Sequence, residues 1–154
     1  MPKPIRNSAK ALVIRDGKML ALRLRDEDCE FYIMPGGGQD GDELLPDAVC
    51  REVAEETGLR VACGELLFVI EGLRGERTHR VDLVFACDYL GELPDADRHA
   101  DTNQIGLEWL DIATLNRQPL YPSRLRRQIM NYAAGKPYRT YLGNENPGDP
   151  EETD

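Results

Sequence analysis

The 154-residue sequence predicts an α+β fold in which a mixed β-sheet lies between helices. Strand-like apolar segments flank a central helical segment on both sides, and short polar turns typical of hairpins join most of these strands. A second helical segment follows the last long strand. Because helices and sheets bury their apolar faces against one another, we expect a sheet sandwiched between the central helix and the C-terminal helix.

The first element is a hairpin over residues 10–25. An apolar run leads to the turn pair Asp16-Gly17, after which three leucines alternate with residues that include Arg23 and Arg25. One face of the second strand is therefore apolar and belongs to the core, whereas the other face carries the two arginines.

A short apolar strand over residues 31–34 comes next. It stops at Pro35 and opens into the run Gly36-Gly37-Gly38. Glycine permits positive φ angles and a close approach of the backbone to other groups, so we expect a loop with a functional purpose here.

Residues 44–57 are expected to form the central helix. They are mostly helix formers, Pro46 is tolerable in the first turn, and Gly58 is placed as the C-terminal stop. Acidic residues near the start, such as Asp47, favour the positive end of the helix dipole.

Two long strands follow over residues 60–73 and 80–90, and the polar loop 74–78 joins them. Their valine, leucine and phenylalanine residues favour strands, and we expect the two to pair as a second hairpin. A short strand over residues 107–110 and a helix over residues 123–134 complete the predicted fold.

The length fits one domain, which we assign to residues 1–142. Residues 143–154 contain prolines, glycines and acidic residues but, at this end of the chain, no large apolar side chain. Such a segment cannot offset the entropy of becoming ordered, so we expect a flexible acidic tail.

The composition excludes several classes of protein. A net charge of −9 and a pI near 4.8 argue against sequence-independent binding to nucleic acid, which needs a basic surface. No apolar run approaches the ~20 residues that cross a bilayer, which predicts no membrane partner and a cytoplasmic location. The four cysteines form no C-x-x-C pair, so a zinc site is not expected.

Three carboxylates share one face of the central helix. At roughly 100° per residue, Glu52, Glu55 and Glu56 fall within an arc of about 100°. Val49 and Val53 lie to one side of that arc, which places the carboxylates beside the core. Like charges this close repel each other, and a divalent cation would remove that cost. Hard oxygen ligands of this kind select Mg²⁺, Mn²⁺ or Ca²⁺ over zinc, and Mg²⁺ or Mn²⁺ is the expected cofactor; the alternative is an ordinary solvated helix face.

The wider spacing favours the metal interpretation. Gly37 is followed after five residues by Glu43, and after seven more by the run Arg51-Glu52-Val53-Ala54-Glu55-Glu56-Thr57-Gly58-Leu59. This pattern resembles the Nudix box of the Nudix hydrolase superfamily at each of its fixed positions. The resemblance implies a Nudix fold, in which the box forms a loop, helix and loop, and a mixed sheet lies between helices.

The resemblance also implies roles for the residues of the box. Glu52 and Glu56 would be the principal metal ligands, Glu55 a further ligand or the group that activates water, and a glycine carbonyl near Gly37 another ligand. Arg51 would hold Glu43 or a ligand glutamate in orientation, because a planar guanidinium can fix a carboxylate through two hydrogen bonds.

The expected activity is divalent-metal-dependent hydrolysis of a phosphoanhydride bond. The substrate would be a small molecule: a nucleoside diphosphate linked to another moiety, or a nucleoside triphosphate. A non-catalytic nucleotide-sensing module is the alternative, and isomerisation of a prenyl diphosphate is a weaker one, because its motifs are missing. Homodimers are frequent among members of the superfamily, so a homodimer is an option for this chain.

Residues outside the box add weaker signals. Arg23 and Arg25 lie on a strand that leads toward the glycine loop, where they could bind a substrate phosphate; a solvated strand face is the alternative. The basic cluster between Arg74 and Arg80 is either a charged hairpin turn or a substrate contact. Many members carry an acid shortly before the strand with the tryptophan, where this chain has Gln104, with Asp101 the nearest acid.

Overall fold

The computed structural model describes residues 2–74, 77–94 and 103–152. Its elements, in chain order, are β1 (Ile5–Arg15), β2 (Lys18–Asp26), β3 (Cys29–Ile33), β4 (Gly36–Gly38), α1 (Leu45–Thr57), β5 (Leu59–Gly72), β6 (His79–Glu92), β7 (Gln104–Asp111), the 3₁₀ helix η1 (Ile112–Arg117), β8 (Leu120–Tyr121), α2 (Leu125–Ala133) and β9 (Tyr141–Asn144).

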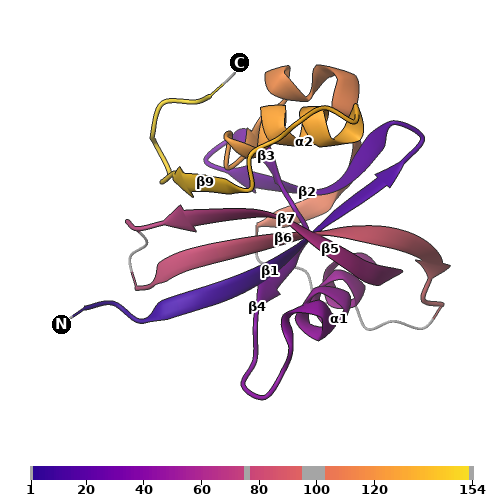
Figure 1. The fold of residues 1–154 in the computed structure, drawn as a ribbon, viewed down its shortest axis with the longest axis horizontal. Helices are drawn as coiled ribbons and strands as arrows, with labels where there is room; N and C mark the ends of the chain where they lie inside the picture. The colour runs from indigo at the N-terminus through magenta and orange to yellow at the C-terminus, as the bar shows by residue number, and fades with distance from the viewer. Residues whose placement is uncertain (1, 75–76, 95–102, 153–154) are drawn as a thin grey trace.

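The sheet lies between the two α-helices, as the sequence predicts (Figure 1). Its strands run in the order β8-β3-β2-β1-β6-β5-β9, with β4 also paired to β1 and β7 to β2. One apolar cluster packs under α1 and a second packs under α2 and η1. In the part of the chain that the structure describes, no helix is long and apolar enough to span a membrane.

The β1–β2 hairpin turns at Asp16 and Gly17, whose φ angles are 52° and 75°. Two consecutive positive φ angles are typical of the two-residue turns whose twist matches that of a hairpin. Ile14 pairs with Met19 directly beside the turn. The predicted hairpin is therefore confirmed.

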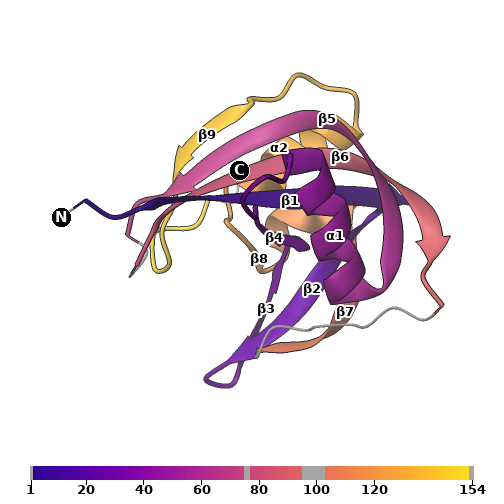
Figure 2. The same ribbon diagram turned by 90° about the horizontal axis from the view of Figure 1, so that it is seen from below.

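Strand β1 belongs to two parts of the sheet. From Ile5 to Val13 it runs parallel to β6, and it pairs with β2 only at its end. On its other side, residues 8–10 pair with β4. The sheet consequently divides beyond β4, with β6 and β5 on one side and β2 and β3 on the other (Figure 2).

The glycine run forms the short strand β4, where the sequence predicted a loop. Gly36 has a φ angle of 138°, and a Cβ atom there would lie 2.1 Å from the carbonyl oxygen of Ala9. Only glycine allows so close an approach of the two backbones. The tripeptide pairs with β1 for that reason, although glycine has a low strand propensity.

Helix α1 begins at Leu45, one residue later than predicted, and ends at Thr57 as predicted. Pro46 lies in the first turn, and Gly58 ends the helix in the left-handed region, with its N–H donating to the carbonyl of Ala54. Val49 and Val53 are fully buried against the sheet. The adjoining side of the same helix, together with β4, forms the polar surface described below.

Residues 145–152 contact the domain, in contrast to the expected free tail. Strand β9 runs parallel to β5, and Glu145 follows it. The Glu145 carboxylate is 8% exposed and accepts hydrogen bonds from the backbone N–H groups of Ser123 and Arg124, at 2.6 and 3.0 Å, and from the Ser123 hydroxyl. Polar contacts at the start of α2 hold this segment. The expectation of a free tail considered only apolar side chains and therefore did not include these contacts.

We predict that Glu145→Ala lowers the free energy of unfolding by about 2 kcal/mol, because the buried donors at the start of α2 lose their acceptor. Urea titration measures this. Glu152→Ala is the matched control: its side chain forms only ion pairs of 3.5–3.6 Å at the surface, and its loss should cost below about 1 kcal/mol. Equal effects of the two substitutions would contradict the assigned role of Glu145.

Candidate active site

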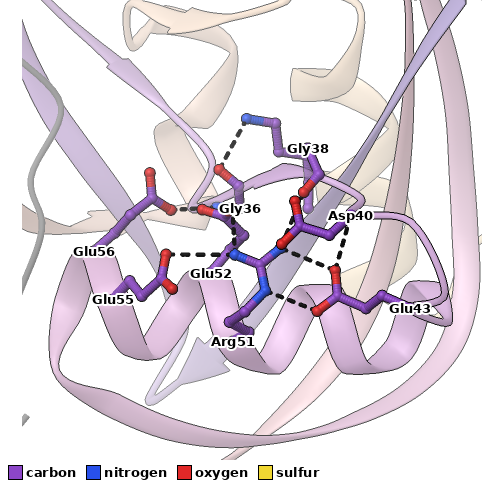
Figure 3. Close-up of polar contacts among 9 residues, drawn as sticks. Gly36, Gly38, Asp40, Glu43, Arg51, Glu52, Glu55 and Glu56 are labelled. Carbon is purple, nitrogen blue, oxygen red and sulfur yellow. Dashed lines mark hydrogen bonds and ion pairs between the residues drawn. The ribbon is translucent and has the colours of Figure 1, made fainter.

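One face of α1 presents three glutamates toward β4 (Figure 3). The Glu56 side chain is buried, with 4% of the residue exposed, whereas the side chains of Glu52 and Glu55 are 18% and 39% exposed. Exposure to solvent therefore increases from Glu56 to Glu52 to Glu55, although the three residues lie within less than two turns of the helix. The predicted arc on one helix face is present.

Arg51 lies at the centre of this face and holds several acids at once. Its Nε and Nη2 atoms donate to the two oxygens of Glu43 at 2.7 and 2.9 Å. Its Nη1 atom donates to Glu52 at 3.0 Å and to Glu55 at 3.5 Å, and Nη2 also donates to the Gly38 carbonyl at 3.1 Å. The two-bond grip on a carboxylate that the sequence suggested is formed with Glu43.

The Arg51 guanidinium changes the protonation of its partner. Its hydrogen bonds, with a further one from the Asp40 backbone N–H, lower the pKa of Glu43 from 4.5 to about 2. Glu43 in turn raises the pKa of Arg51 further above its usual range. Both groups are therefore charged at neutral pH, and Arg51 offsets part of the repulsion among the glutamates.

Glu56 connects the helix to the glycine run. Its Oε1 accepts a hydrogen bond of 2.7 Å from the backbone N–H of Gly36. On the other side of the same glycine, the Lys10 ammonium donates to the Gly36 carbonyl at 3.5 Å. Gly36 thus lies between a buried carboxylate on the α1 side and a lysine on the α2 side of β1.

Gly37 lies directly against Glu52. A Cβ atom on Gly37 would come within 2.6 Å of the Glu52 carboxyl carbon, so the position accepts no side chain without displacing that carboxylate. Carboxylate and glycine backbone together offer only hard oxygen donors, the ligand type that Mg²⁺ and Mn²⁺ prefer. The chemistry of this donor set fits a divalent cation.

The side chains of Glu52, Glu55 and Glu56 do not point toward one common position. Among the described residues, no group of three or more acidic, histidine or cysteine side chains has a geometry that could hold a metal ion. Glu52 and Glu55 turn to Arg51, whereas Glu56 turns to Gly36. Arg51 thus supplies a positive charge that offsets part of the repulsion between Glu52 and Glu55.

A cavity of about 650 Å³ opens between the two parts of the sheet, on the α2 side of β1. Lys10 lines it and reaches the Gly36 carbonyl, so the cavity adjoins the glycine run. Asp82 and Val84 of β6 form one wall, and Tyr121 forms part of another. The carboxylate face and the cavity meet at β4.

Comparison with known proteins identifies the family. The NUDIX domain matches residues 4–131, which is most of the chain and includes every residue of the box. This chain belongs to the Nudix hydrolase superfamily. The Nudix pattern that the sequence analysis found between Gly37 and Leu59 is thereby confirmed as a family feature.

Several Nudix proteins resemble the chain. A MutT-like protein of Streptomyces ambofaciens is 42% identical over 82 residues, which cover 52% of this chain and 49% of that protein. An ADP-ribose pyrophosphatase of Methanocaldococcus jannaschii is 27% identical over 127 residues, or 80% of this chain and 72% of that protein. The match thus spans about half the length of the Streptomyces relative.

Solved structures support the fold. A NUDIX hydrolase of Nitrosomonas europaea superposes with a TM-score of 0.70 at 22% identity, over 90% of this chain and 93% of that one. At this identity the likeness concerns the fold alone. The predicted Nudix fold, a mixed sheet between helices, is confirmed.

Arg23 and Arg25 do not reach the Nudix carboxylates through any described ion pair. Both contact Glu30 across the β2–β3 pair, with nitrogen–oxygen distances of 3.6 Å. Neither residue lines the cavity, although their neighbour Asp26 does. Contact with a substrate phosphate stays a prediction for these two arginines.

Gln104 occupies the place where many Nudix proteins carry an acid. Its Nε2 atom donates to the backbone carbonyl of Glu56 at 3.2 Å, so it supports the end of α1. Asp101, the nearest acid, lies outside the described residues. A catalytic acid outside the Nudix box is therefore not assigned.

The residues of the basic cluster near the β5–β6 turn contact different partners. His79 bonds to Glu71 at 2.7 Å, and Arg80 donates to Asp82 at 2.9 Å. Of these four described residues, Arg80 and Asp82 line the cavity and His79 and Glu71 do not. Asp82 lies two residues beyond the basic cluster, and a lone acid in an apolar strand carries no motif that would have predicted its place in the cavity wall.

The Glu43–Arg51 pair makes stability depend on pH. Because the pKa of Glu43 is lowered in the folded protein, its contribution is complete above about pH 5 and is lost as the pH falls toward 2. We predict that Glu43→Gln destabilises the protein at pH 7 and that this difference from wild type shrinks as the pH is lowered to 3. Urea midpoints measured from pH 3 to 7 test this.

A double-substitution control separates the pair from its surroundings. In an Arg51→Gln background, the Glu43→Gln change should have a much smaller effect at pH 7, because the partner is already lost. A difference between wild type and Glu43→Gln that is equal at pH 7 and pH 3 would contradict the assigned pair.

Proposed function

We propose that this Nudix protein is a divalent-metal-dependent hydrolase of a phosphoanhydride bond. The substrate would be a nucleoside diphosphate linked to another moiety, or a nucleoside triphosphate. The observation that carries the proposal is the Arg51-centred set of glutamates on α1, which lies against a glycine run whose backbone is open to close approach.

The metal would be held by the side chains of Glu52, Glu56 and Glu55 and by the Gly37 carbonyl. Mg²⁺ or Mn²⁺ suits these donors, because both prefer carboxylate and carbonyl oxygen and retain sites for water and substrate phosphates. When bound, the cation supplies charge stabilisation at phosphorus and lowers the pKa of a bound water.

The protein's own side chains would orient the carboxylates of the site and accept the proton of the attacking water. Arg51 fixes Glu43 through two bonds and thereby keeps its remaining N–H groups directed at Glu52 and Glu55. Glu55 is the most exposed of the three helix carboxylates and would take a proton from the attacking water. Water would attack phosphorus and release a nucleoside monophosphate, with a phosphorylated product or pyrophosphate.

The cavity offers room for the rest of the substrate. A volume of about 650 Å³ lies within the range of small-molecule sites, and Lys10 stands where the cavity meets Gly36. A cation at this junction would attract a phosphate and leave the organic part of the substrate inside the cavity.

A non-catalytic, nucleotide-binding role is the second candidate. In its favour, Glu52 and Glu55 bond to Arg51 and do not converge on one point. Against it, the chain retains every glutamate of the Nudix box. The named activities of relatives, such as the ADP-ribose pyrophosphatase of Methanocaldococcus jannaschii, support hydrolysis without identifying the substrate.

We predict Mg²⁺- or Mn²⁺-dependent release of monophosphate or pyrophosphate from at least one member of a panel. The panel contains nucleotide sugars, NADH, ADP-ribose, dinucleoside polyphosphates and nucleoside triphosphates. Glu56→Gln should lower kcat on that substrate by about 100-fold or more, because it removes a buried anionic oxygen from the site.

Glu65→Gln is the matched control, since the same change is made on an exposed residue of β5. It should leave kcat unchanged. Binding of Mn²⁺, followed by electron paramagnetic resonance, should weaken in Glu56→Gln and not in Glu65→Gln. Equal, measurable turnover by wild type and Glu56→Gln would overturn the role assigned to Glu56, whereas no turnover by either protein across the panel would support the binding module.

A further inference from the structure

We propose that Arg6 is a further substrate-binding residue, and that it binds the phosphoryl group of the substrate that lies farther from the cavity. This inference rests on the proposed function only in taking a compound with a phosphate chain as the ligand. It concerns the binding of phosphate, so it can be tested without turnover.

Arg6 lies on the face of β1 that points away from α1. Alternate residues of a strand share a face, so Arg6, Ser8 and Lys10 lie on one face. Ala9 and Ala11, which alternate with them, are buried in the apolar cluster under α1. Lys10 lines the cavity, and Arg6 is therefore on the cavity side of the same strand.

The pairing of β1 with β4 brings Arg6 to the glycine run. Residues 8–10 pair with β4, and the Arg6 guanidinium lies beside Gly38. A Cβ atom on Gly38 would overlap the Nη2 atom of Arg6 and lie 2.7 Å from its Nε atom. A Cβ atom on Gly37 would instead meet the Glu52 carboxylate. The two neighbouring glycines thus have an arginine on one side of β4 and a carboxylate of the Nudix box on the other.

The charge of Arg6 is not neutralised by a described acid. Arg6 is exposed, and among the residues that the structure describes it forms no hydrogen bond and no ion pair. Arg51, which also contacts Gly38, differs in this respect, because Glu43 holds it through two hydrogen bonds. Of these two arginines at β4, Arg6 is the one whose N–H donors are available to a ligand.

A guanidinium in this position suits a phosphate. Its donors form a planar fork that binds two oxygens of one phosphoryl group at once. The chain has a net charge of −9, so an anionic substrate needs a local positive charge to approach the site. Arg6 and Lys10 supply that charge on the cavity side of β4.

Arg6 and Lys10 contact β4 at two glycines that are two residues apart. Lys10 lines the cavity and donates to the Gly36 carbonyl at 3.5 Å. Arg6 lies beside Gly38 and, among the described residues, is not part of the cavity lining. Two residues of a strand span about 7 Å, which is close to the reach of a diphosphate group. The phosphoryl group next to the organic part would therefore lie near Lys10, and the following one would lie near Arg6.

The test measures binding of methylenediphosphonate by calorimetry in the presence of Mg²⁺. The carbon bridge of this compound replaces the oxygen of a diphosphate and cannot be hydrolysed, so binding is observed without reaction. Arg6→Gln should weaken the binding by about fivefold or more, because a hydrogen-bonded charge contact is lost. The loss should shrink when NaCl is raised from about 0.05 M to about 0.5 M, because salt screens an exposed contact.

Two further variants isolate the effect. Arg60→Gln makes the same change of charge on an exposed residue of β5 and should keep the wild-type affinity. Arg6→Lys keeps the charge but loses the planar fork, so its affinity should lie between those of wild type and Arg6→Gln. Equal affinities of wild type and Arg6→Gln, an equal loss in Arg6→Gln and Arg60→Gln, or no binding by wild type would each overturn the proposal.

Failure of the proposed function gives a different result from failure of this inference. If no member of the panel is hydrolysed but Arg6→Gln alone weakens binding of the diphosphonate, the phosphate contact stands and the assignment as a hydrolase falls. If hydrolysis is found and Arg6→Gln binds the diphosphonate as wild type does, the role of Arg6 falls and the hydrolase stands.

Discussion

The structure of the site depends on one arginine that gathers acids from two elements. Arg51 grips Glu43 through two hydrogen bonds and contacts Glu52 and Glu55 with its remaining nitrogen. Without a central positive charge, carboxylates one turn apart on a helix would repel one another and turn to solvent.

The division of the sheet beyond β4 brings the two surfaces of the proposed site together. Because Gly36 packs against the backbone of β1, it can receive Glu56 from the α1 side and Lys10 from the other side. The α1 carboxylates and the cavity therefore adjoin the same glycine run. A phosphate chain near β4 could extend to both.

The helix, the hairpins and the contact of Arg51 with Glu43 were predicted from the sequence. Each of them depends on residues that are close in the chain or on the fixed spacing of the Nudix box. Contacts between distant segments were not predictable in the same way. Glu145 holds the C-terminal segment on α2, and Arg23 and Arg25 pair with Glu30. Asp82 carries no motif, and only the closing of β6 over β3 and β8 places it in a cavity.

The proposed metal site is tested most directly by a crystal structure of the protein with Mn²⁺, located by anomalous scattering. An ion should lie between Glu52, Glu56 and the glycine run, and both Arg51 bonds to Glu43 should be preserved. Carboxylates turned to solvent with no ion between them, at a manganese concentration that supports turnover in related enzymes, would contradict it.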